Sequence, residues 1–328
     1  MRRSAEPASP ARSSSPAGSR SSPFRDAYDP RVDPEAIAER VWPGRRVTLE
    51  PLGGGITNRN FKVDLDGETL VLRIGGKDTE LLGIDRSVEH GASLAAAAAG
   101  IGPEVVGFVE PEGYLVTRYI EGRPVPPEEM RSPARIRQVA GTLRRFHDGP
   151  GVPGRFDSFR IVEAYCVTAR AHGVRIPDAY EPAKETAAAI ERARGAEGGR
   201  TRPCHNDLLN ANFIDDGELR IVDWEYAGMG DRFFDLANFS VNHELGENEN
   251  HGLVAAYFRE SRAADLDALV LMRFMSDFRE AMWGDVQQGI SELDFDFVAY
   301  ADNHFARLDR TAFDDGFRAA LERSEAPA

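Results

Sequence analysis

A short stretch rich in acidic and amide side chains, residues 205–213, carries the groups best suited to chemistry. Asp207 and Asn212 lie within it, and Asp223 follows at the end of an apolar run. Carboxylate and amide oxygens are the ligands that a hard cation such as Mg²⁺ prefers. Phosphoryl transfer asks an enzyme mainly to orient the acceptor hydroxyl and to neutralise the phosphates. The stretch therefore predicts phosphoryl transfer from ATP, with Asp207 beside the acceptor hydroxyl and with Asn212 and Asp223 as Mg²⁺ ligands.

A β-hairpin is expected to bring these ligands together. Asp215-Asp216-Gly217 is a turn signal between two short runs, residues 212–214 and 218–222. Pairing of the runs returns Asp223 to the side of Asn212. An ordinary surface loop rich in Asp and Asn is the alternative, and the agreement of residue types, spacing and turn disfavours it.

Residues 204–226 resemble the catalytic segment of the choline/ethanolamine kinase family, in the aminoglycoside-phosphotransferase-like branch of the protein-kinase-like fold. The resemblance implies an α+β, bilobal fold with a small antiparallel β-sheet N-lobe that contains one helix, and a larger, mainly helical C-lobe. It also implies that Asp207 accepts the hydroxyl proton and that His205 supports the catalytic loop through hydrogen bonds. The residues that match are Asp223-Trp224-Glu225-Tyr226, Phe234-Asp235 and Asn238.

Length and composition suggest how the chain is divided. With 328 residues, 41% of them hydrophobic, the chain can bury the cores of two lobes. Residues 1–25, rich in Ser, Pro and Arg, are expected to be a disordered tail. We expect an N-terminal nucleotide-binding lobe over residues 26–120 and a Gly- and Pro-rich connector over residues 121–127. Residues 128–328 are expected to form a helical lobe that catalyses transfer and binds the acceptor.

Charge and cysteine content indicate which kind of substrate the chain could bind and in which compartment it could act. The part from His205 to the C-terminus carries 26 Asp and Glu residues against 10 Arg and no Lys, an excess larger than that of the whole chain at −14. This distribution favours a small cationic substrate over nucleic acid, although acidic residues can also serve solubility alone. The two cysteines suggest a cytoplasmic protein, and no apolar run predicts membrane insertion. A monomer or a homodimer fits equally well.

Short β-rich runs predict an antiparallel sheet between residues 46 and 119. Asp66-Gly67 marks one hairpin turn, and Pro111-Glu112-Gly113 marks another. A helix is predicted over residues 87–99 from its Ala and Leu content, with Ser87 as a possible N-cap and with Gly100 ending it. The expected strands are residues 46–52, 60–65, 69–74, 105–109 and 114–119.

Three glycines, Gly53-Gly54-Gly55, join the first two strands. Glycine lets backbone N–H groups approach phosphates closely. A glycine-rich hairpin without a ligand is commoner, but the catalytic stretch downstream favours contact with a nucleotide. The nucleotide-binding residues predicted here are Gly54, Gly55, Thr57 and Asn58.

The third strand presents Arg73 where a protein kinase carries its phosphate-contacting lysine, and the resemblance extends to this arginine. A guanidinium offers a planar fork to phosphate or carboxylate. We expect Arg73 to contact the nucleotide and to pair with Glu89, whose alternative is an exposed position on the helix. By the resemblance, the backbone around Thr117 and Tyr119 binds the adenine edge.

Helical periodicity dominates the rest of the chain. Residues 149–202, rich in Pro and Gly at both ends, are expected to be an insert that contains one helix. The predicted helices are residues 135–146, 182–194, 234–242, 248–257, 264–288 and 293–308.

Residues 278–300 resemble the choline-pocket segment of the same family. Aromatic faces recognise quaternary ammonium groups, so Tyr226, Trp283 and Tyr300 form a possible three-sided cage, with packing in the core as the alternative. Glu280 stands where eukaryotic choline kinases carry a second Trp, and Asn242 stands where they carry Glu. Because a carboxylate accepts N–H bonds, Glu280 favours a primary or secondary amine, so ethanolamine or another amino alcohol stands beside choline as an expected acceptor.

The sequence thus predicts a Mg-ATP-dependent kinase of a cationic amino alcohol. An aminoglycoside or other small-molecule phosphotransferase of the same fold is one alternative, disfavoured by Arg73 and Trp283. A nucleotide-binding regulatory pseudokinase is another, disfavoured because Asp207, Asn212 and Asp223 are all present.

Overall fold

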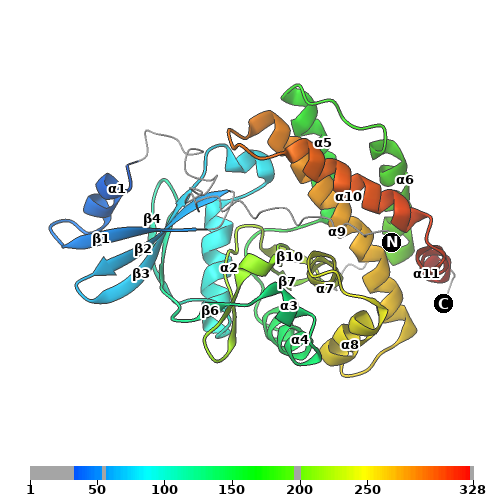
Figure 1. Ribbon diagram of the computed structural model, residues 1–328, viewed down its shortest axis with the longest axis horizontal. Helices are drawn as coiled ribbons and strands as arrows, with labels where there is room; N and C mark the ends of the chain where they lie inside the picture. The colour runs from blue at the N-terminus through cyan, green and yellow to red at the C-terminus, as the bar shows by residue number, and fades with distance from the viewer. Residues whose placement is uncertain (1–32, 54–56, 196–200, 326–328) are drawn as a thin grey trace, which may run out of the picture.

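The computed structural model describes residues 33–53, 57–195 and 201–325. The predicted tail and the predicted nucleotide ligands Gly54 and Gly55 lie outside these ranges. A β-sheet forms one end of the molecule and a larger group of helices the other (Figure 1). This arrangement confirms the predicted α+β fold class. No helix in the described ranges combines the length and the apolar character needed to cross a lipid bilayer.

The N-terminal sheet has five antiparallel strands in the order β1-β2-β3-β5-β4. Alternate residues of β2 and β3 point into one small core, where Phe61, Val63, Leu70 and Leu72 pack against helix α1 (Pro34–Val41). The five predicted strands are present within two residues of their expected ends, whereas α1 was not predicted. The strands are β1 (Val47–Leu52), β2 (Asn58–Leu65), β3 (Glu68–Gly75), β4 (Val105–Val109) and β5 (Tyr114–Arg118).

Helix α2 (Arg86–Ala98) lies close to this sheet and begins earlier than predicted. The expected N-cap, Ser87, is wrong. Asp85 caps the helix, because its carboxylate accepts hydrogen bonds from the backbone N–H groups of Ser87 at 2.8 Å and Val88 at 3.2 Å. A single 3₁₀ turn, η1 (Thr79–Leu82), leads into it.

The segment after β5 is less irregular than predicted. Strand β6 (Arg123–Pro124) pairs with β8 (Phe213–Asp215), which pairs in turn with β9 (Leu219–Ile221). The backbone N–H of Val125 also donates to the carbonyl of Phe213 at 3.1 Å. The edge of the catalytic hairpin therefore fixes the start of the helical part, and helix α3 (Pro127–Met130) begins directly afterwards.

Helix α9 (Ala263–Ile290) is the centre of the helical part and is buried on almost every side. Helices α5, α7 and α10 pack along it. The predicted insert is wrong in its organisation, because α5 within it joins the main core through Tyr165 and Ala169. The remaining helices are α4 (Pro133–His147), α5 (Ser158–Ala171), α6 (Tyr180–Arg194), α7 (Arg232–Asn242), α8 (Glu247–Phe258), α10 (Phe297–Ala312) and α11 (Asp315–Glu325).

Candidate active site

The predicted catalytic loop connects strand β7 (Thr201–Cys204) to β8 and includes the 3₁₀ turn η2 (Asn210–Asn212). His205 is fully buried; its Nε2 lies 3.0 Å from the carbonyl of Val222, and its Nδ1 accepts the backbone N–H of Asp207 at 3.2 Å. These bonds require a neutral ring with its proton on Nε2. Burial lowers the pKa of His205 and keeps that form. His205 thus joins the start of the loop to the far strand of the hairpin.

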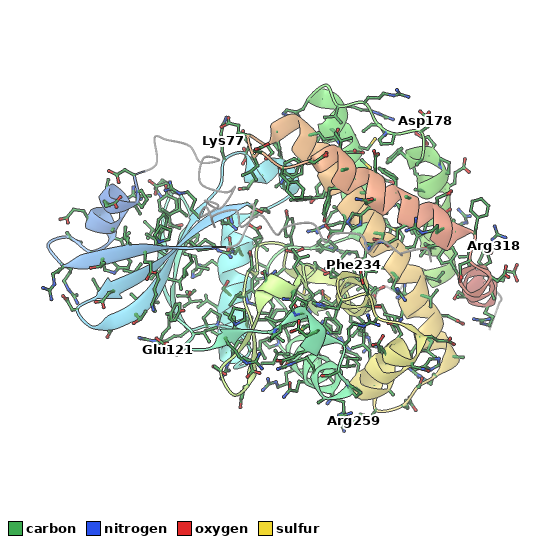
Figure 2. The ribbon with its side chains drawn as sticks, viewed as in Figure 1. Lys77, Glu121, Asp178, Phe234, Arg259 and Arg318 are labelled. Carbon is green, nitrogen blue, oxygen red and sulfur yellow. The ribbon has the colours of Figure 1, made fainter. Side chains whose placement is uncertain are left out.

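Asp235, at the start of α7, is the anchor of the same loop. Its carboxylate accepts the backbone N–H groups of His205 at 2.8 Å and Asn206 at 2.6 Å, and it lies 2.9 Å from Nε2 of His147. The hydroxyl of Tyr257 lies 2.7 Å from the other nitrogen of His147. The neighbouring Phe234 lies in the interior of the helical part, so this anchor is rigidly packed (Figure 2). Asp235 was identified from the sequence as a residue that matches the family, but its role as an anchor of the loop was not predicted.

The two predicted metal ligands lie together. The backbone N–H of Val222 donates to the carbonyl of Asn212 at 3.0 Å, which places the next residue, Asp223, beside Asn212. The Asn212 amide nitrogen donates to the carbonyl of Asp207 at 2.9 Å and so leaves its oxygen available. Asp223 holds a left-handed backbone with φ of 69°, an unusual conformation for a non-glycine residue. One amide oxygen and one carboxylate suit Mg²⁺, so these residues fit the ion that the chemistry requires.

An ionic network joins the N-terminal sheet to the hairpin. Nη1 of Arg73 donates to Glu89 at 2.5 Å and to Asp223 at 2.7 Å, so the structure contains the expected Arg73–Glu89 pair. A second arginine, Arg86, pairs with Glu89 at 2.7 Å and with Glu225 at 3.2 Å. Burial, reinforced by Asp223, raises the pKa of Glu225 to about 7, against the opposing effect of the two arginines. Arg86 was missed, although its place three residues before Glu89 is a usable signal.

The other predicted nucleotide ligands occupy different surroundings. Asn58 is buried and its side chain is committed to the network, since it donates to Glu225 at 2.8 Å and accepts from Arg86 at 3.0 Å. Thr117 lies on β5, directly opposite Val71. Tyr119 follows that strand, and its backbone N–H donates to the carbonyl of Thr69 at 3.1 Å. Thr57 precedes β2, close to the backbone of Gly76.

Four of the five predicted acceptor-binding residues come together between α9, α10 and the end of the hairpin. The indole N–H of Trp283 donates to the hydroxyl of Tyr226 at 3.1 Å, and the rings of Trp283 and Tyr300 are 5.6 Å apart. The Tyr300 hydroxyl donates to Glu280 at 2.7 Å. Asn242 instead donates to Asn238 at 3.2 Å, and among the described residues it forms no hydrogen bond with the other four.

Asn238 belongs to the support of the loop. Its side-chain oxygen accepts the backbone N–H of Leu208 at 2.6 Å, and its amide donates to Ser276 on α9 at 3.1 Å. Asn242 therefore stabilises the catalytic loop from behind, through Asn238.

Arg279 is a site residue that the sequence reasoning missed. It is 2% exposed, and its Nη1 lies 2.5 Å from Glu280 and 3.3 Å from Asp207. Burial lowers the pKa of the guanidinium, but the two carboxylates outweigh this and raise it, so the side chain is charged. Burial also raises the pKa of Asp207 to about 8; Arg279 opposes the rise and Glu280 adds to it. The adjacent charges of Arg279 and Glu280, flanked by Phe278 and Ala281, were the available signal, because charged side chains are rarely buried unless they are paired.

Comparison with known proteins supports the same chemistry. The profile of the Phosphotransferase enzyme family matches residues 48–269. A choline/ethanolamine kinase family protein from Mesorhizobium loti is 32% identical, with a TM-score of 0.76 over 89% of this chain and 98% of that one. The choline kinase LicA from Streptococcus pneumoniae, 22% identical, shares the fold with a TM-score of 0.71 over 84% and 98% of the two chains. A probable ethanolamine kinase from Arabidopsis thaliana is 24% identical over 77% of this chain and 76% of its own length.

Proposed function

Because the chain belongs to the phosphotransferase enzyme family, as a choline/ethanolamine kinase-like member, we propose that it transfers the γ-phosphoryl group of Mg-ATP to the hydroxyl of a small cationic amino alcohol. The acceptors proposed are ethanolamine and choline, which the names of the similar kinases give. The observation that carries this proposal is that the phosphate side and the acceptor side of the site meet at Asp207. The Asn212 amide donates to the Asp207 backbone, while the Asp207 carboxylate lies 3.3 Å from Arg279 on α9.

Asp207 is the group that receives the acceptor proton. Its side chain is largely buried and fixed by the bond from its backbone N–H to His205, so a hydroxyl that hydrogen-bonds it is oriented for attack on phosphorus. In a largely dissociative transfer the proton moves late, and a carboxylate is a sufficient base. Bound Mg²⁺, held by Asn212 and Asp223, would neutralise charge on the phosphates.

The nucleotide lies between the sheet and the helical part. Arg73 on β3 faces the phosphates, as its bonds to Glu89 and Asp223 suggest. The backbone from residue 117 to residue 120 meets the adenine edge. We keep the division into a nucleotide-binding part over residues 26–120, a connector over residues 121–127 and an acceptor-binding part from residue 128 onward. Both cysteines, Cys166 and Cys204, are unpaired, which suits the cytoplasm.

The residues proposed to bind the acceptor are Tyr226, Glu280, Trp283 and Tyr300. Glu280 is 3% exposed, and each of its oxygens already accepts one hydrogen bond, from Arg279 or from Tyr300. A carboxylate oxygen can accept a second bond, so Glu280 retains the capacity to bind an ammonium N–H. The acidity of the C-terminal part attracts such a cation from a distance.

A coupled assay of ADP release tests the proposal. With Mg-ATP, ethanolamine or choline should support turnover far above the rate with water alone, and an aminoglycoside should not. Asp207→Asn should abolish the difference while binding of ATP persists. Turnover that requires an aminoglycoside, or an undiminished rate in Asp207→Asn, would overturn it.

A further inference from the structure

One aromatic face of the proposed acceptor pocket is already occupied by the protein itself. The guanidinium carbon of Arg279 lies 4.3 Å from the centre of the Tyr226 ring. Aromatic faces attract cations, and a quaternary ammonium group depends on them because it has no N–H to donate. A trimethylammonium group would therefore have to compete with Arg279 for Tyr226.

Arg279 is held firmly in this position. Its Nη1 contacts Glu280 at 2.5 Å and Asp207 at 3.3 Å, and all three side chains are buried. Removing the arginine from between them would leave two buried carboxylates without their partner, which is costly. Among the described residues, its Nε and Nη2 have no hydrogen-bond partner, and the contact of the guanidinium with the Tyr226 ring is a further attraction that it has there. The arginine thus gains from staying on the ring.

The other two aromatic residues offer little open surface. Trp283 is 7% exposed, and its edge-to-face contacts with Phe297 and Tyr300 have ring centres 5.8 and 5.6 Å apart. Tyr300 packs against His304 with ring centres 4.6 Å apart and donates its hydroxyl to Glu280. These rings pack against one another more than they enclose a space. The polar wall formed by Asp207 and Glu280 stays available to a ligand that can donate N–H bonds.

We infer that Arg279 is a specificity-determining residue, a resident cation on Tyr226 that directs the enzyme toward primary and secondary ammonium alcohols and away from quaternary ones. This inference rests on the proposed function, because it concerns which amino alcohol enters the same pocket. It assigns the discrimination to Arg279, whereas Glu280 stabilises Arg279 and accepts the ammonium N–H.

The test is kcat/KM with ethanolamine, N-methylethanolamine, N,N-dimethylethanolamine and choline. In the unmodified protein, kcat/KM for choline should be lower than kcat/KM for ethanolamine by roughly tenfold or more, which is the scale of one aromatic–cation contact. Arg279→Met puts an unbranched apolar side chain in place of the charged one and should raise the ratio of kcat/KM for choline to that for ethanolamine at least tenfold. Arg279→Lys keeps a cation and should preserve the original order. Glu280→Gln keeps a side-chain oxygen that can accept the bond from Arg279, so Arg279 should stay on the ring and the variant should lower ethanolamine use without improving choline use.

A second measurement does not depend on any variant folding. Tetramethylammonium should inhibit the unmodified enzyme far more weakly than methylammonium does. Equal or better use of choline by the unmodified enzyme would overturn the inference and leave the proposed function intact. An unchanged ratio of kcat/KM for choline to that for ethanolamine in folded Arg279→Met would also overturn it. A rise in choline use in Glu280→Gln would do the same. Failure of all four alcohols as acceptors would overturn the proposed function, and this inference with it.

Discussion

Arg73 and Asp223 are joined by a hydrogen bond of 2.7 Å although 150 positions separate them in the chain. The bond ties strand β3 of the N-terminal sheet to the residue proposed to hold the metal ion. The same guanidinium nitrogen bonds Glu89, so a single side chain fixes helix α2, the sheet and the catalytic hairpin relative to one another.

Arg73→Met tests this link. Loss of the guanidinium leaves Glu89 with Arg86 alone and deprives Asp223 of its bond to Arg73, so we expect a loss of roughly 3–5 kcal/mol in the free energy of unfolding and a higher KM for ATP. Denaturant titration and steady-state kinetics measure the two effects. Arg118→Met is the matched control, because its pair with Glu104 is exposed and should change stability by less than about 1 kcal/mol. Equal effects of the two variants would contradict the role of Arg73.

Asp207→Asn should separate catalysis from folding. The amide cannot accept the acceptor proton, so kcat should fall by roughly 10²–10⁴-fold. Because burial raises the pKa of Asp207 to about 8, the neutral replacement removes a charge that the site disfavours, and Tm should stay level or rise. Asp216→Asn, in the exposed hairpin turn, should alter neither quantity. A fall in Tm together with kcat would show that Asp207 mainly stabilises the fold.

Asp235→Asn should destabilise the loop of residues 205–212 without changing a proposed metal ligand. The backbone N–H groups of His205 and Asn206 bond different oxygens of Asp235, so an amide leaves one of these donors facing an NH₂ group, and we expect a loss of roughly 2–5 kcal/mol in the free energy of unfolding and a lower kcat. Asp157→Asn is the control, because Asn caps the start of α5 as well as Asp does. Chemical denaturation distinguishes the two, and equal stability would rule out the anchoring role of Asp235.

Gly284→Ala should act on the acceptor side alone. A Cβ at Gly284 would lie 3.0 Å from the Tyr300 ring and 3.1 Å from Ala301, so α10 must shift away from α9. We expect KM for the acceptor to rise several-fold while KM for ATP stays constant. Gly252→Ala on α8 meets no atom within 4 Å and should stabilise the protein by up to about 1 kcal/mol. An unchanged acceptor KM in Gly284→Ala would show that the position of Tyr300 is irrelevant to binding.

Asp285 makes stability depend on pH. It is fully buried, one of its oxygens has no hydrogen-bond partner among the described residues, and burial raises its pKa from 3.8 to about 7. The folded state then binds the proton more tightly than the unfolded state, so this residue lowers stability as pH rises from about 4 to about 7. Asp285→Asn should therefore raise the free energy of unfolding by roughly 2–4 kcal/mol at pH 8 and much less at pH 4.

Urea denaturation at the two pH values measures this difference. Asp302→Asn, the exposed neighbour on α10, should give a change of less than about 0.5 kcal/mol at either pH. A gain that did not depend on pH would contradict the assignment to Asp285.

Short-range sequence patterns predicted most of the helices and strands, because turns, helix caps and hydrophobic periodicity each depend on residues close together in the chain. The hairpin around Gly217 and the five strands of the sheet are of this kind. The choice of Ser87 over Asp85 as N-cap failed because both residue types cap helices well and they lie two positions apart. Helix α5 was missed because the flanking Gly and Pro residues obscured an apolar face that only α9 completes.

The site was predictable where the ligands are close in sequence and not where distant segments meet. Asp207, Asn212 and Asp223 share one hairpin. Arg279 meets Asp207 across 72 positions, and Arg86 meets Glu225 across 139, so no spacing in the sequence reports either contact. Their partners are fixed by the packing of α9 and α2 against the hairpin, which is a tertiary property.

Helix α9 brings together several of the residues proposed to act at the acceptor. This one rigid helix carries Ser276 behind the catalytic loop and then Arg279, Glu280 and Trp283 along the acceptor wall. The groups proposed to handle phosphate lie elsewhere in the chain. Apart from Tyr226, the residues proposed to bind the alcohol therefore lie in a different stretch of the chain from those proposed to handle phosphate. Substitutions in a few turns of one helix could change the acceptor while the residues of the phosphate side stay the same.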